Sequence, residues 1–150
     1  MKTLSLFTIA LGSLLLASCS TVPMSSASAD SEAKQFTPPP GRANVYITRG
    51  FGVGSALVFQ TILDGRIAGA LSTNTYQLLS VPSGQHTLIV TATENVEQTT
   101  LNVQSGRNYF VQVSVKMGWL RGRVSIQHIS ETEGRSMVLS SKRAAANTYQ

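Results

Sequence analysis

Apolar and polar residues alternate along most of the chain, in short stretches separated by turn residues. Residues 109–115 show the pattern most clearly, because their odd-numbered side chains are all apolar and in a strand such side chains share one face. Regularly spaced stretches of this kind are typical of all-β domains. They predict strands over residues 43–48, 56–63, 67–71, 76–81, 86–92, 97–103, 109–116 and 123–129. We therefore expect an antiparallel β-sandwich of about seven to eight strands.

The apolar faces of these strands and the residues between them predict the core and the turns. Asp64-Gly65 suits a two-residue hairpin, since glycine accepts a positive φ angle. Pro82-Ser83-Gly84 and Ser105-Gly106 mark further turns. The expected core consists of Val45, Ile47, Leu57, Phe59, Leu88, Val90, Leu101, Val103, Val111, Val113, Val124 and Ile126.

The C-terminal part carries one helix signal. Ser130 and Glu133 have the spacing of a capping box, but Gly134 weakens the helix that would follow. We predict a short helical turn or helix there, with the β-sandwich domain spanning residues 41–143. Residues 144–150 are expected to fray.

The first nineteen residues have a different pattern. Lys2 is followed by an apolar stretch over residues 4–16, which is too short for a stable membrane span but suits a secretory signal. The stretch ends in Leu16-Ala17-Ser18-Cys19, which resembles the lipobox of bacterial lipoproteins. That resemblance implies a signal peptide over residues 1–18, cleavage between Ser18 and Cys19, and a diacylglycerol on the Cys19 thiol. The alternative is an ordinary signal peptide with a coincidental cysteine.

The residues after the cysteine bear on location. Ser20 stands where an aspartate would imply inner-membrane retention, so the resemblance implies an outer-membrane lipoprotein with its domain in the periplasm. Residues 20–40 are rich in Ser, Ala and Pro, and such stretches bury too little surface to fold. With Cys19 they predict a flexible tether, residues 19–40, with a reach of about 25 Å.

Composition and charge narrow the classes of function. Only 13% of the residues are charged, which excludes a highly charged disordered chain, and the single cysteine excludes an intrachain disulfide. The net charge is +5 and the pI is about 9.8. A basic exported lipoprotein points to anionic lipids or cell-wall polymers as neighbours rather than to nucleic acid.

Five segments carry a family resemblance. They are residues 41–49, 63–69, 81–88, 105–111 and 131–135, which read GRANVYITR, LDGRIAG, VPSGQHTL, SGRNYFV and ETEGR. In this order they resemble bacterial lipoproteins with a β-sandwich domain of unknown function, related to PEGA-type and transthyretin-like modules. The resemblance implies a sandwich with no assigned enzymatic activity.

Few residues suggest catalysis or metal binding. His86 and His128 are the only histidines, too few with the remote Cys19 for a zinc site, so each is expected to make a structural hydrogen bond. No Gly-x-Ser-x-Gly elbow or clear carboxylate pair is present. The glycines of residues 50–54 precede a predicted strand, whereas a phosphate-binding loop opens a helix. We expect no metal, no cofactor and no enzymatic activity; a hydrolase with an unrecognised site is the alternative.

The most suggestive surface segment is a basic hairpin between the last two strands. Lys116, Trp119, Arg121 and Arg123 would form a candidate binding patch, since tryptophan with cations suits a lipid headgroup or an anionic glycan. In the alternative reading, Trp119 folds back over the end of the sandwich.

A rival motif points to inhibition. Ser105-Gly106-Arg107-Asn108-Tyr109 resembles the Ser-Gly-x-x-Tyr loop of lipoprotein inhibitors of c-type lysozyme, although their second motif is missing. The leading hypothesis is a lipid-anchored envelope protein with a non-enzymatic interaction module, whose partner is another envelope protein or an anionic polymer. The alternative is an inhibitor of an envelope hydrolase.

Overall fold

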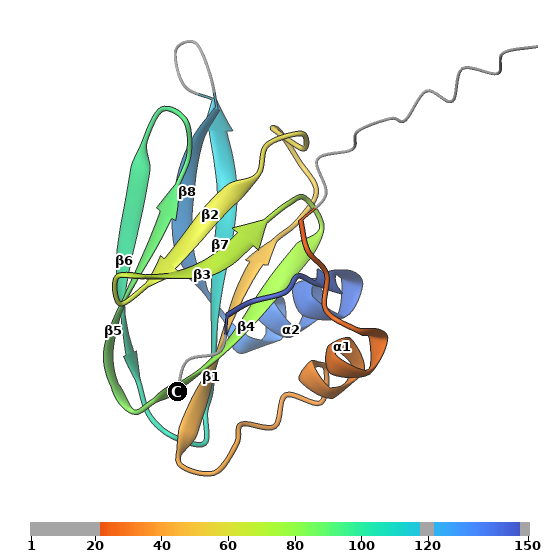
Figure 1. Cartoon of the computed structure of the whole chain (residues 1–150), viewed down its shortest axis with the longest axis vertical. Coiled ribbons are helices and arrows are strands. Elements are labelled where there is room, and N and C mark those ends of the chain that lie inside the picture. Colours follow the sequence, from red (N-terminus) through yellow and green to blue (C-terminus); the bar gives the residue numbers. More distant parts are fainter. Residues whose placement is uncertain (1–21, 118–121, 148–150) are drawn as a thin grey trace, which may run out of the picture.

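Two β-sheets pack face to face and form the sandwich that the sequence predicts (Figure 1). The computed structural model describes residues 22–117 and 122–147. One sheet has the order β8-β7-β1-β4-β9 and the other the order β3-β2-β5-β6. The strands are β1 (Arg42–Arg49), β2 (Phe59–Leu63), β3 (Arg66–Leu71), β4 (Thr75–Pro82), β5 (Gly84–Thr91), β6 (Val96–Val103), β7 (Asn108–Met117), β8 (Gly122–Ile129) and β9 (Lys142–Arg143). The helices are α1 (Ala27–Ala33) and α2 (Glu131–Ser140).

All eight predicted strands are present, but the pairing is not purely antiparallel. Strand β1 pairs in parallel with β7, and β4 pairs in parallel with the two-residue β9. The chain leaves the five-stranded sheet after β4, forms β5 and β6 in the other sheet, and then returns as β7 in the same direction as β1. The hairpin between β2 and β3 is confirmed, with positive φ angles of 50° at Asp64 and 77° at Gly65.

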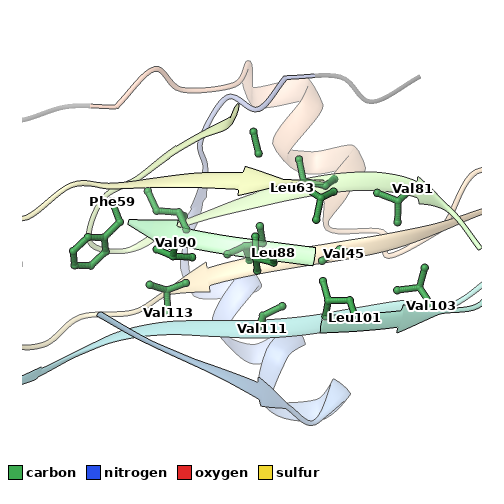
Figure 2. Close-up of a cluster of buried hydrophobic side chains, with 14 of the residues drawn as sticks. Val45, Phe59, Leu63, Val81, Leu88, Val90, Leu101, Val103, Val111 and Val113 are labelled. Carbon is green, nitrogen blue, oxygen red and sulfur yellow. The ribbon is translucent and has the colours of Figure 1, made fainter. Parts of the chain in front are cut away.

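The core between the sheets matches the expected set (Figure 2). Every predicted core residue is buried except Leu57 and Ile126, which are half-buried against the cluster. Because successive strand residues point to opposite faces, the alternation in the sequence was sufficient to identify this layer.

A second core lies on the outer face of the five-stranded sheet, and the sequence did not predict it. Tyr46, Tyr76 and Phe110 project from β1, β4 and β7 and are buried beneath the two helices. The rings of Tyr46 and Phe110 stack with their centroids 5.0 Å apart. Both faces of this sheet are therefore covered by apolar packing in its central part.

The N-terminal segment supplies part of that cover, so the expectation of a flexible tether does not hold from Val22 onward. Val22 is only 5% exposed and Phe36 only 7%. Ser26 caps α1 by accepting a hydrogen bond from the Ala29 N–H, at 3.2 Å. The Tyr46 hydroxyl donates to the carbonyl oxygen of Ala33 at 2.7 Å. A few apolar side chains are enough to order this polar segment, because the aromatic outer face of the five-stranded sheet gives them a surface against which to pack.

The C-terminal residues are also ordered as far as Asn147, which corrects the prediction of fraying from residue 144. The Ala144 N–H donates to Tyr76 of β4, and the Asn147 N–H donates to Ala68 of β3, both at 2.8 Å. The tail thereby bridges the two sheets along their open edge. The Ala145 N–H also donates to the carbonyl oxygen of Pro23 at 2.8 Å, which ties the N-terminal segment to the same edge.

Helix α2 confirms the short C-terminal helical element that the sequence predicted, and it has ten residues. The predicted cap is present, since the Glu133 N–H donates to the Ser130 hydroxyl at 3.2 Å. A Cβ atom at Gly134 would lie 2.2 Å from the ring of Phe110, so the glycine lets the helix approach the sheet closely. Neither of the described helices is long and apolar enough to cross a bilayer.

Candidate functional site

The described part of the predicted basic patch lies where β7 ends and β8 begins. Lys116 and Arg123 are direct cross-strand partners, and both are exposed. Like charges directly opposite each other on neighbouring strands repel. Neither residue forms an ion pair with any other residue in the described ranges 22–117 and 122–147. Trp119 and Arg121 lie outside the described residues.

The loop over residues 50–58 packs against this end of the β7–β8 pair. A Cβ atom at Gly54 would lie 3.1 Å from the Val115 side chain, and one at Gly122 would lie 3.4 Å from Leu57. A groove of about 150 Å³ separates the start of the loop from β7. The loop and the two basic residues thus form one continuous end of the molecule, which we call the loop end.

A buried arginine holds the base of this loop. Arg49 is 3% exposed, and its guanidinium donates to the carbonyl oxygens of Gly54 at 2.6 Å, Leu57 at 2.5 Å and Leu71 at 3.3 Å. Its guanidinium carbon also lies 4.3 Å from the ring centroid of Phe59. Burial lowers the pKa of Arg49 below its ordinary value. Three carbonyl dipoles and an aromatic face replace the hydration that the charge has lost, so Arg49 serves the conformation of the loop.

The loop end exposes large apolar side chains. Phe51 is 83% exposed, Val53 58% and Met117 77%. Exposed apolar side chains are common singly, but when they gather at one end of a protein they mark contact surfaces. The loop is followed by strand β2, the strand that the sequence predicted after these glycines.

The two histidines make the structural hydrogen bonds that the sequence predicted. His86 Nδ1 lies 2.6 Å from Asp64 Oδ2, and Nε2 lies 2.9 Å from the carbonyl oxygen of Pro82. Burial alone would raise the pKa of the Asp64 carboxyl, but hydrogen bonds from His86 and the Thr87 N–H hold it below its ordinary value. His128 Nε2 lies 2.8 Å from the Thr99 hydroxyl and links β8 to β6.

The described residues contain no cluster of three or more His, Cys, Asp or Glu side chains placed to hold a metal ion.

The Ser-Gly-x-x-Tyr segment forms the turn between β6 and β7. Within it, the Tyr109 hydroxyl accepts a hydrogen bond from the Gln104 N–H at 2.9 Å, and Gly106 has a φ angle of 79°. These contacts give the motif an architectural role.

A cleft of about 390 Å³ opens between the N-terminal segment and the outer face of β1 and β4. Arg42 and Arg143 supply positive charge to its walls and Glu32 supplies negative charge. Arg42 donates to Ser80, while Arg143 Nη1 donates to the carbonyl oxygen of Ala29 at 2.9 Å. Sequence reasoning missed this cleft because two of its walls come from the presumed tether and the presumed frayed tail.

Comparison with known proteins identifies the family of the chain. No solved structure matches the chain significantly. A protein of Haemophilus influenzae (strain ATCC 51907 / DSM 11121 / KW20 / Rd), described as uncharacterized, is 29% identical over 126 residues, which cover 83% of this chain and 75% of that protein. The model of the family described as a protein of unknown function, DUF2846, matches residues 39–125. The chain therefore belongs to the DUF2846 family.

Proposed function

We propose that the protein is a lipid-anchored component of the bacterial cell envelope, carrying its β-sandwich as a non-enzymatic interaction module. The observation that carries the proposal is the segment Leu16-Ala17-Ser18-Cys19, which follows a basic start and a short apolar stretch. Cleavage before Cys19 would leave the acylated cysteine as the first residue. Acylation by more than one chain anchors a protein stably at a bilayer. Ser20 favours the outer membrane, with the domain in the periplasm.

The interaction role draws support from the loop end. Its apolar side chains and its two cations lie together, whereas the polar groups of both histidines are used within the fold. We infer that the partner is an envelope protein or an anionic envelope polymer, and that the candidate patch of Lys116, Trp119, Arg121 and Arg123 contacts anionic groups of the envelope. Nucleic acid is not expected at this location.

Replacement of the cysteine tests the anchor. The Cys19→Ala variant should lose palmitate labelling and leave the membrane fraction, whereas Ser18→Ala should keep both because alanine is also small. Ser20→Asp should move the labelled protein from the outer to the inner membrane, with Ser20→Thr as its control. Persistent palmitate labelling of Cys19→Ala would overturn the anchor.

A pull-down from detergent-solubilised envelope tests the interaction module. The wild-type chain should retain structural envelope components, and Lys116→Gln with Arg123→Gln should weaken that retention. Recovery of a stoichiometric hydrolase would favour the inhibitor hypothesis instead, and turnover of a cell-wall substrate by the pure protein would favour an enzyme.

A further inference from the structure

The ordered N-terminal segment shortens the link between Cys19 and the folded domain. The described residues begin with Val22, which is buried, and the next residues pair with the C-terminal tail through Pro23 and Ser25. Only two residues, Ser20 and Thr21, separate Val22 from Cys19, so the link has three Cα-to-Cα steps. An extended chain spans at most about 3.3–3.6 Å per residue, so this link reaches about 10 Å. A lipid on Cys19 would therefore hold the edge of the domain against the bilayer.

The loop over residues 50–58, which is one part of the loop end, lies close to this point of attachment, whereas Lys116 and Arg123 lie further away on β7 and β8. The Ser25 N–H donates to the carbonyl oxygen of Arg143 at 3.0 Å, and the neighbouring Lys142 N–H donates to Asn74 at 3.2 Å. Asn74, Ser141 and Phe51 line one shared groove. In Figure 1 the first described residues and the loop after β1 both lie in the upper right part of the molecule. The hydroxyl of Thr73 also donates to Ser55 of the loop at 2.9 Å, which connects the loop to this region.

We propose that the loop end is a membrane-docking surface, with Phe51 and Val53 inserted among the lipid headgroups and Lys116 and Arg123 placed over anionic phosphates. The proposal rests on the anchor at Cys19 proposed above. A link of about 10 Å leaves no room for a protein domain beneath this side, since a single helix with its side chains is already about 10 Å in diameter. Lipid is the occupant that fits the space.

The chemistry of the loop end suits that occupant. Apolar side chains beside cations match a membrane interface, where hydrocarbon lies under phosphate. The repulsion between the opposed Lys116 and Arg123 would be relieved by an anion lying over both. Because Arg49 already fixes the loop, little conformational freedom is lost when the loop docks.

Fluorescence quenching on the lipidated full-length protein tests the proposal. Phe51→Cys is labelled with the environment-sensitive dye NBD, since acylation leaves Cys19 without a free thiol. Ser105→Cys is the matched control, because it lies beyond the other end of the ten-residue strand β7, about 30 Å away. Both proteins are reconstituted into vesicles of phosphatidylethanolamine and phosphatidylglycerol in a 3:1 ratio, and acrylamide serves as a neutral quencher.

The dye at position 51 should be blue-shifted and should lose most of its quenching, whereas the dye at position 105 should stay fully accessible. In vesicles of phosphatidylcholine alone, the protection at position 51 should decrease. Equal quenching at both positions in a protein that carries palmitate would overturn the docking surface and leave the anchor intact. A protein without palmitate would overturn the anchor and the docking surface together. Both substituted side chains are exposed, so neither change removes a packing contact from the core.

Discussion

Phe36 offers the sharpest test of whether the N-terminal segment belongs to the folded domain. Its ring centroid lies 5.3 Å from that of Tyr46 and 6.1 Å from that of Phe110, and the Arg135 guanidinium carbon lies 4.4 Å from the ring on the side of α2. Phe36→Ala would remove this ring from between the sheet and the helix. The backbone at Phe36 has a φ angle of 56°, but alanine meets the same restriction, so the change acts mainly through packing.

Burial sets the size of the effect. Phe36 is 7% exposed, and removing a buried phenylalanine side chain costs about 3–5 kcal/mol through lost transfer free energy and the cavity left behind. This is a large share of a typical stability of about 5–15 kcal/mol. At roughly 2–4 °C per kcal/mol, the melting temperature should fall by roughly 6–20 °C.

Urea denaturation of the unlipidated chain from Ser20 onward would measure the change, with calorimetry for the melting temperature. Phe51→Ala is the matched control, because the same ring is removed from a side chain that is 83% exposed. Its free energy of unfolding should change by less than about 0.5 kcal/mol. Equal, small effects of both substitutions would show that residues 22–40 are a free tether after all.

Three further predictions concern the folded domain. Gly134→Ala should lower the melting temperature in calorimetry, because a Cβ atom 2.2 Å from Phe110 outweighs the helix-propensity gain of about 1 kcal/mol; a rise would contradict the close approach. The pKa of Asp64 is lowered in the fold, so its contribution to stability is present above the ordinary value of 3.8 and is lost as the pH falls below it. In urea denaturation, Asp64→Asn should flatten the dependence of the free energy of unfolding on pH in that acid range. An unchanged slope would refute the contribution of the Asp64 carboxylate to stability. Burial raises the pKa of Tyr46 from 10.0 to about 12, so the wild-type fold should lose stability as the pH rises between these values. The pKa of Tyr76 is raised as well, so Tyr46→Phe should lose less stability over this range than the wild type, and parallel denaturation profiles would count against the role of Tyr46.

The sequence predicted the inner layer of the fold and missed most of the outer one. Alternation identifies a strand and its apolar face, which is why all eight long strands and their shared core were expected. The outer aromatic residues Tyr46, Tyr76 and Phe110 alternate with that core and so fall on the face that a simple sandwich exposes to water. Part of their cover comes from α1, a seven-residue helix in a Ser- and Ala-rich segment that no local pattern distinguishes from a linker.

The candidate site was predictable only where it follows from strand pairing. Lys116 and Arg123 flank a predicted hairpin, so their opposition across β7 and β8 could be anticipated. The role of Arg49 could not be predicted, because a charged residue at the end of an apolar strand gives no sign that three backbone carbonyls will surround it. The available signal was the glycine-rich loop that follows it, where the backbone turns back toward the guanidinium.

The most direct test of the central claim is the intact mass of the native protein extracted from membranes. The native protein should begin at Cys19, with a diacylglycerol on the thiol and an acyl chain on the new amine. The Cys19→Ala variant should show none of these additions. A native protein that begins elsewhere, or that begins at Cys19 without lipid, would contradict the anchor.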